Sequence, residues 1–146
     1  MKPSLLVVLL FLSLLAAACG NGGGGGEAQA TEAQLAQGKA LYEANCASCH
    51  GLAGEGQPNW KTPDANGVYP APPHDSTGHT WHHPDEVLLQ VMAQGTGMPK
   101  SGMPTFQGVL TREEMEAILA YIKTFWGEEE RAFQKQVTDQ WKEQNR

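Results

Sequence analysis

Cys46-Ala47-Ser48-Cys49-His50 is the stretch that decides how this chain of 146 residues folds. The segment before it, residues 32–44, is rich in Ala, Gln, Leu and Glu, which favour helix. A Cys-x-x-Cys pair of the thioredoxin type belongs to a βαβ unit with a preceding strand, so this helical segment argues against one. A zinc site needs a second pair of ligands, and the sequence holds only one other cysteine, Cys19.

The pattern Cys-x-x-Cys-His is instead the attachment signature of c-type haem. Two thiols three residues apart on one helical turn reach the two vinyl groups of one porphyrin, and the adjacent histidine then lies under the iron as the proximal ligand. We therefore expect one covalently bound haem c, attached through Cys46 and Cys49 and ligated by His50. A structural disulfide between the two cysteines would leave the histidine without a role.

Four downstream methionines are candidates for the opposite face of the iron, where a soft thioether favours the reduced metal. Met92 and Met115 fall in apolar patterns with helical spacing, so we expect both to be core residues. Met98 and Met103 each lie in a Gly-Met-Pro tripeptide within the loop segment 95–108. The residues themselves leave both of these open as the sixth ligand.

Residues 32–126 resemble the class I cytochromes c in three separated features. In that family a glycine in the N-terminal helix lets the C-terminal helix approach closely. The residues that match these facing positions are Gly38, Tyr42, Ile118 and Tyr121. The third feature, Met103-Pro104-x-Phe106, resembles the methionine-ligand loop of the family and favours Met103 over Met98 as the sixth ligand.

The resemblance implies an all-α class I cytochrome c fold, with helices and loops wrapped around one haem. The spacing of apolar residues predicts helices over residues 84–94 and 112–126, and Thr111 with Glu114 predicts a capping box at the start of the second. The family also implies a proline carbonyl that accepts a hydrogen bond from the haem histidine, and Pro72 and Pro73 are the candidates.

Residues 1–18 have the pattern of a secretory signal peptide, with Lys2, an apolar block and small residues before Cys19. The apolar block is shorter than the roughly 20 residues that a membrane-spanning helix needs. The stretch Leu15-Ala16-Ala17-Ala18-Cys19 resembles the lipobox of bacterial lipoproteins, so we predict lipidation of Cys19. The alternative is an ordinary signal peptide with an incidental cysteine. Residues 19–31 contain five consecutive glycines and would form a flexible tether.

Without residues 1–18 the chain has 9 basic and 16 acidic residues, a formal charge of about −7. Nucleic-acid binding needs a basic patch, so this charge argues against it. We expect an exported protein, in the periplasm or anchored to the outer face of the cell membrane, that carries electrons between redox partners such as respiratory complexes. The alternatives are an electron-entry subunit of a larger respiratory oxidoreductase and a haem sensor or peroxidase with a labile methionine.

Two further segments have more than one interpretation. A histidine cluster lies between the haem motif and residue 84, and it could supply an axial ligand, bind a metal or form a polar loop. Its members are His74, His79, His82 and His83. The extension 127–146 has the pattern of an amphipathic helix with Phe133, Val137 and Trp141 along one stripe, suited to docking on a partner or on its own domain.

Overall fold

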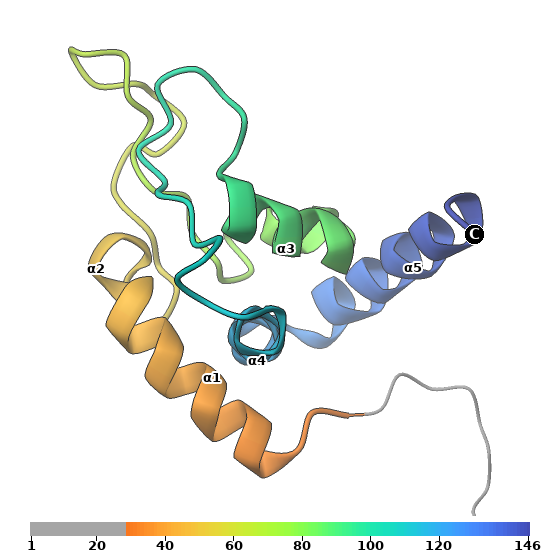
Figure 1. Ribbon diagram of the computed structural model, residues 1–146. Coiled ribbons are helices and arrows are strands. Elements are labelled where there is room, and N and C mark those ends of the chain that lie inside the picture. The colour runs from red at the N-terminus through yellow and green to blue at the C-terminus, as the bar shows by residue number, and fades with distance from the viewer. Residues whose placement is uncertain (1–28) are drawn as a thin grey trace, which may run out of the picture.

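The fold is a set of helices joined by long loops, and the computed structural model describes residues 29–146. The α-helices are α1 (Glu32–Asn45), α2 (Ala47–His50), α3 (Asp85–Gln94), α4 (Arg112–Ile122) and α5 (Glu128–Gln144), with 3-10 turns η1 (Thr80–His82) and η2 (Lys123–Phe125) (Figure 1). No strand is present in residues 29–146, which confirms the all-α prediction. The predicted signal peptide, the lipidation site Cys19 and the tether up to residue 28 lie outside the described residues.

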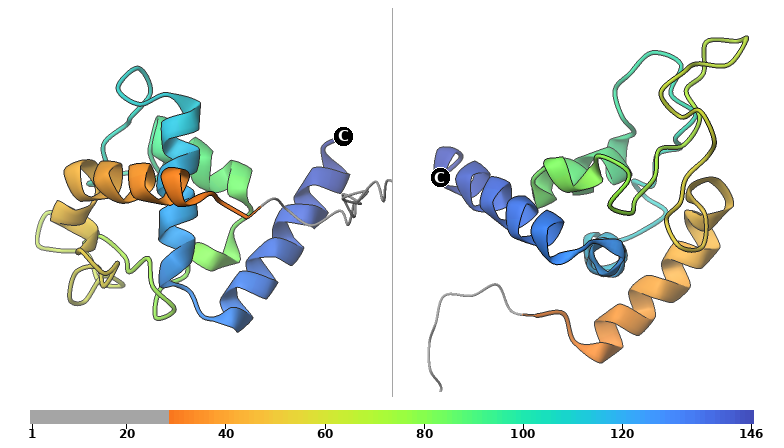
Figure 2. Two further views of the ribbon diagram at one scale, coloured as in Figure 1. Left: turned by 90° about the horizontal axis from the view of Figure 1, so that it is seen from below. Right: turned by 180° about the vertical axis from the view of Figure 1, so that it is seen from behind.

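The crossing of α1 and α4 organises the molecule (Figure 2). At the contact, a Cβ atom added to Gly38 would lie 2.0 Å from the carbonyl oxygen of Ala117, so only glycine permits this approach. Tyr42 and Ile118 are fully buried beside it, and the rings of Tyr42 and Tyr121 meet edge to face at 5.5 Å. The four residues that resemble facing positions of the cytochrome c helices therefore lie together.

The apolar core extends from this crossing toward α3. Met92 and Met115 are both buried in it, as their helical spacing predicts. The other buried apolar side chains of the cluster are Tyr42, Leu88, Leu89, Ile118, Leu119, Ile122 and Trp126. One continuous core thus links the helix before the haem motif to the two helices that follow it.

Side-chain caps mark where the two crossing helices begin. The hydroxyl of Thr31 accepts a hydrogen bond from the backbone N–H of Gln34 at the start of α1. Thr111 and Glu114 form the predicted capping box at the start of α4, with each side chain accepting from the backbone N–H of the other residue. Both caps satisfy backbone donors that a helix start leaves unpaired.

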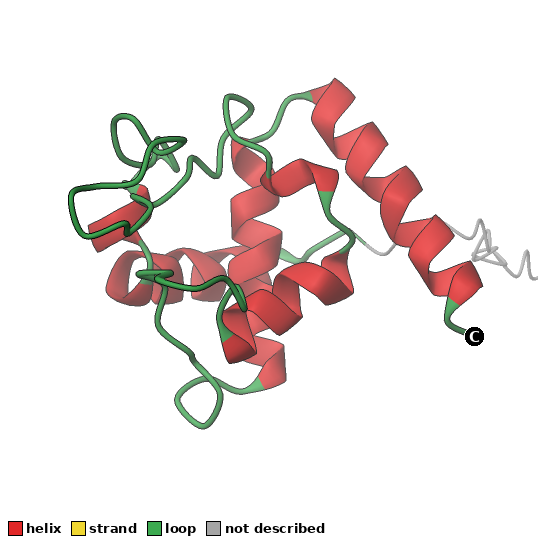
Figure 3. Ribbon diagram, turned by 90° about the horizontal axis from the view of Figure 1, so that it is seen from above, coloured by secondary structure: helices red, strands yellow, loops and turns green. Residues whose placement is uncertain are grey.

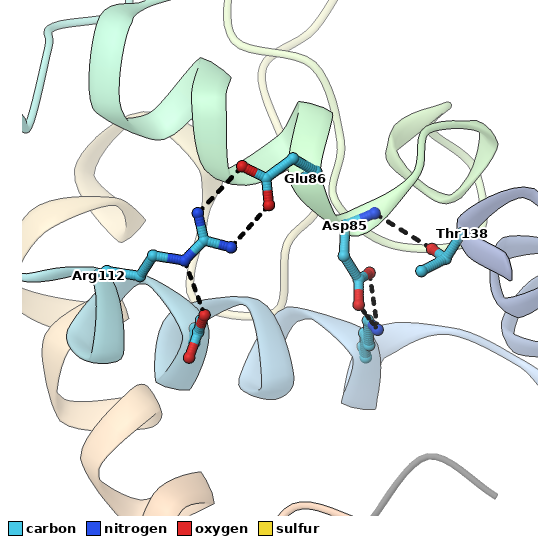
Figure 4. A network of polar contacts seen from close by, with 6 residues as sticks. Asp85, Glu86, Arg112 and Thr138 are labelled. Carbon is cyan, nitrogen blue, oxygen red and sulfur yellow. Dashed lines mark hydrogen bonds and ion pairs between the residues drawn. The ribbon is translucent and has the colours of Figure 1, made fainter. Parts of the chain in front are cut away.

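Polar contacts tie α3 to its neighbours (Figure 4). The guanidinium of Arg112 donates two hydrogen bonds to the carboxylate of Glu86, at 3.0 and 2.6 Å. On the same helix, Asp85 accepts from the Nζ of Lys123 at 2.8 Å, and its backbone N–H donates to the hydroxyl of Thr138 in α5. Asp85 therefore joins three helical segments.

Helix α5 lies back on its own domain, against η1 and the start of α3. The expected stripe is only part of the contact, because Phe133 remains 43% exposed while Gln134 and Thr138 are the buried side chains. The Nε2 of Gln134 donates to Asp85, to Thr138 and to the carbonyl oxygen of His83. The apolar pattern missed this polar face because hydrophobic spacing does not register buried amides and hydroxyls.

The remaining chain is mostly loop and gathers on one side of the helices (Figure 3). Residues 51–79 form a long loop, and η1 is a short turn at its end. An isolated bridge joins Tyr69 to Ser101, and the Nζ of Lys100 donates to the carbonyl oxygen of Asn66. These contacts hold the long loop against the methionine loop.

Candidate haem site

Helix α2 is a single turn that carries the cysteine motif. Cys46 closes α1 and begins α2, and its carbonyl oxygen accepts hydrogen bonds from the N–H groups of Cys49 and His50 at 3.1 and 2.9 Å. Residues three apart on a helical turn share one face. Both cysteines are free thiols in the described structure, so the disulfide alternative finds no support there.

The two thiols differ in their surroundings. Cys46 is partly buried against the core, and burial, together with the nearby charge of Cys49, raises the pKa of its thiol to about 11. Cys49 is exposed to solvent. The side chain of Cys46 therefore lies against the core, and that of Cys49 lies at the surface.

The ring of His50 is fixed by the backbone of a distant loop. Its Nδ1 lies 2.9 Å from the carbonyl oxygen of Pro72, which assigns the proton to Nδ1 and leaves Nε2 as the free lone pair. Burial lowers the pKa of this histidine, although the hydrogen bond to Pro72 opposes that effect. A neutral imidazole with an anchored Nδ1–H is the form that binds a metal through Nε2.

A close approach of two loop segments brings Pro72 to that position. The N–H of Gly56 donates to the carbonyl oxygen of His50 at 2.7 Å, and the N–H of His74 donates to that of Gly54 at 2.6 Å. A Cβ atom on Gly56 would lie 2.5 Å from the backbone nitrogen of Pro73, so glycine is needed for the segments to run side by side. Of the two candidate prolines, Pro72 is the one whose carbonyl meets the histidine.

His74 lies directly against the motif histidine. The two rings are stacked, with centroids 3.8 Å apart and planes inclined by only 14°. Burial, and then the charges of His50 and His79, lower the pKa of His74 well below the ordinary value, so its ring is neutral at pH 7. The sequence singled out His74 only as one member of a cluster, and no local pattern signalled the stack.

The two candidate methionines lie in different environments. Met103 packs against the hydrophobic core, and its N–H donates to the hydroxyl of Ser101. Met98 is 53% exposed. Beyond them the chain is anchored to α3, because the N–H of Phe106 donates to the carbonyl oxygen of Met92. Met103 is therefore the one in contact with the interior of the domain.

The rest of the histidine cluster does not form a metal site. His79 stacks on Trp60 at 5.3 Å and meets His83 edge to face at 5.6 Å, while His82 contacts Trp81. Within residues 29–146 no group of three or more His, Cys, Asp or Glu side chains is arranged to hold a metal ion. The cluster is a set of ring contacts around η1.

A helical domain with a Cys-x-x-Cys-His turn, a histidine held through its Nδ1 and a core-facing methionine has the donor set of proteins that bind haem c covalently. The residues present fit that group: two free thiols on one turn, and an imidazole whose Nε2 is left for iron. The cytochrome c family model matches residues 35–126, and the chain belongs to that family. Its cofactor is therefore one covalently bound haem c, and the all-helical fold is that of a cytochrome c domain.

Two curated relatives are much longer proteins. A 1-butanol dehydrogenase (cytochrome c) of Thauera butanivorans is 39% identical over 88 residues, which cover 60% of this chain and 11% of that protein. A nitrite reductase of Stutzerimonas stutzeri is 29% identical over 91 residues, covering 58% of this chain and 15% of that protein. The chain thus matches only a small part of each, and no solved structure matches it.

Proposed function

We propose that this chain is an electron carrier, an exported monohaem cytochrome c tethered to a membrane. Cys46 and Cys49 would hold the haem through thioether links, and His50 and Met103 would bind its iron. The observation that carries the proposal is the hydrogen bond from the Nδ1 of His50 to the carbonyl oxygen of Pro72, because it orients a neutral imidazole for metal binding.

The protein residues would bind, orient and shield the cofactor, which supplies one-electron exchange between Fe(II) and Fe(III). Pro72 holds the ligand ring in one orientation, and the loop before α4 brings Met103 to the core. An iron bound by both His50 and Met103 would have no coordination position left for a substrate, and this supports a carrier rather than an enzyme.

The first experiment measures haem in the full chain made in cells that attach haem c. A pyridine haemochrome assay should give one haem per chain, and Cys46→Ala with Cys49→Ala should abolish covalent attachment. Cys19→Ser is the matched control, because it removes a cysteine without touching the motif. A folded, colourless wild-type protein would overturn the proposal.

The choice of methionine is tested with a matched pair of variants. Met103→Ala should open the iron to carbon monoxide in the ferrous state and remove the sulfur-to-iron charge-transfer band of the ferric state. Met98→Ala should do neither, since that side chain is largely exposed. Carbon monoxide binding by the wild type at neutral pH would instead favour the haem sensor or peroxidase with a labile methionine.

We further propose the division of the chain. Residues 1–18 are a signal peptide, Cys19 is lipidated, residues 19–31 are the tether, 32–126 the cytochrome c domain and 127–146 a helical extension. None of the helices in residues 29–146 is both long and apolar enough to cross a membrane. Because the lipid on Cys19 would be the anchor, Cys19→Ser should release the protein from the membrane fraction, and a variant that stays membrane-bound would contradict lipid anchoring.

A second candidate is an electron-entry subunit of a larger oxidoreductase. It is favoured by the two relatives, which are named as a dehydrogenase and a nitrite reductase and are several times longer than this chain. Deleting residues 127–146 separates the two functions. If the protein is a free carrier, the truncated chain should keep its electron-donor activity toward a soluble acceptor. If it is a subunit that docks through α5, the truncated chain should no longer co-purify with its enzyme.

A further inference from the structure

The backbone of His74 is held from two sides while its ring lies flat on His50. Its N–H donates to the carbonyl oxygen of Gly54 at 2.6 Å, and its own carbonyl accepts from the indole Nε1 of Trp126 at 2.7 Å. These two contacts come from residues 20 positions earlier and 52 positions later in the sequence. These contacts fix the backbone position from which the His74 ring reaches His50.

A histidine at this place has a cost that an apolar residue would avoid. The Nδ1 of His74 is buried and has no hydrogen-bond partner among residues 29–146. A buried polar atom without a partner is unfavourable, and an aliphatic side chain of similar size would fill the space without that penalty. What an aliphatic side chain cannot supply is a flat aromatic face parallel to the His50 imidazole.

The contact restricts a torsion that is otherwise soft. Rotation of an imidazole about its Cβ–Cγ bond has broad minima, and the hydrogen bond to Pro72 selects one orientation by holding the Nδ1 edge, with small rotations of the ring plane still allowed. A second flat ring with its centroid 3.8 Å away and its plane inclined by 14° restricts those small rotations. The plane of the His50 ring is thus set by two contacts, one at its edge and one at its face.

The strength of the stacking contact also depends on the charge of the His50 ring. An aromatic face attracts positive charge. An imidazole bound to ferric iron carries more positive charge than one bound to ferrous iron. In the haem-loaded protein the stack would therefore be stronger in the oxidised state and would lower the reduction potential.

We propose that His74 is a positioning residue for His50, the iron ligand of the proposed function on which this inference rests. Its ring face fixes the plane of the axial imidazole and favours the ferric state. The role differs from that of Pro72, which holds the ring through a hydrogen bond.

The test compares three variants of the full, haem-loaded chain. His74→Leu removes the aromatic face, His74→Phe keeps a flat ring without nitrogen, and His82→Leu is the control, an exposed histidine of the same cluster that contacts Trp81 and Phe133. The reduction potential is measured by optical titration. His74→Leu should change the one-electron equilibrium constant at least threefold in favour of the reduced protein. At 59 mV per tenfold, this raises the reduction potential by about 28 mV. His74→Phe and His82→Leu should shift the potential by less than this.

Electron paramagnetic resonance of the ferric proteins gives g values, which would not change if His74 served only to fill space. The g values depend on the orientation of the axial ring, so they should change or broaden in His74→Leu and be restored in His74→Phe. Unchanged potential and g values in His74→Leu would overturn the inference, and so would equal shifts in the leucine and phenylalanine variants.

If His74→Leu does not accumulate, the wild type supplies the deciding measurement. In the ferric protein the ring protons of His74 must show strong paramagnetic shifts, because the ring touches the axial ligand, and unshifted signals would overturn the inference. The haem assay keeps the two proposals apart. A wild type without haem removes both, whereas a haem-loaded wild type with an insensitive His74 removes only this one.

Discussion

Replacing Gly38 with alanine tests the crossing of α1 and α4, because helix propensity alone predicts stabilisation whereas the close crossing predicts destabilisation. In an exposed helix position the change from glycine to alanine stabilises by roughly 0.8–1 kcal/mol. At Gly38 the new methyl carbon would lie 2.0 Å from the carbonyl oxygen of Ala117, while ordinary contacts begin at 3.4 Å. The helices would have to separate by up to 1.4 Å, the difference between these two distances.

The obstacle is backbone, so no side-chain rotation relieves it. Overpacking of this kind costs about 1–3 kcal/mol, and the rigid obstacle places Gly38→Ala near the upper end. Subtracting the gain of about 1 kcal/mol in helix propensity leaves a net destabilisation of about 2 kcal/mol. For a domain of this size that is a fall in Tm of about 10 °C.

Guanidinium and thermal unfolding of the haem-loaded protein, followed by circular dichroism, would measure the effect. Ala36→Gly is the matched control, because Ala36 lies on the exposed face of α1 and reports helix propensity alone. It should cost about 1 kcal/mol. A Gly38→Ala protein as stable as the wild type, or more stable, would refute the close crossing.

Three further predictions concern other contacts. Gln134→Ala removes the donor that serves Asp85 and the His83 carbonyl, so it should destabilise by about 1–3 kcal/mol in guanidinium unfolding; a loss no larger than that of the exposed Gln136→Ala would contradict this. Burial and neighbouring histidines lower the pKa values of His79 and His83 below 6.5, so the unfolded chain takes up more protons below that pH. Their contribution to stability should be constant above pH 6.5 and decline as the pH falls below it, and a His79→Gln/His83→Gln variant with the same pH slope as the wild type would count against it. Thr111→Ala should cost about 1 kcal/mol through loss of the capping box, and an unchanged Tm would argue that the cap is dispensable.

The sequence predicts the helical framework well because its signals are local or periodic. The capping box at Thr111 and the apolar spacing around Met92 and Met115 depend only on near neighbours, and both are confirmed. The close approach at Gly38 was expected from the resemblance to the class I cytochromes c, and the structure supplies its geometry.

The contacts of the long loop are less accessible to sequence reasoning. Pro72 and Pro73 were equal candidates until the loop path showed which carbonyl meets His50. The stack of His74 on His50 joins residues 24 apart whose approach depends on glycines in between, and no periodicity reports it. Likewise, the buried Gln134 was missed because an amide looks solvent-facing until its partners are known.

The contact between α5 and the rest of the domain affects the order in which the chain unfolds. Besides the edge-to-face contact of Phe133 with Trp81, it uses the amide of Gln134 and the hydroxyl of Thr138, groups that can also form hydrogen bonds with water. A detached α5 would expose the Phe133 ring, which is already 43% exposed in the docked helix, and would hydrate the polar groups of Gln134 and Thr138. We therefore expect α5 to detach from the domain before the crossing of α1 and α4 separates.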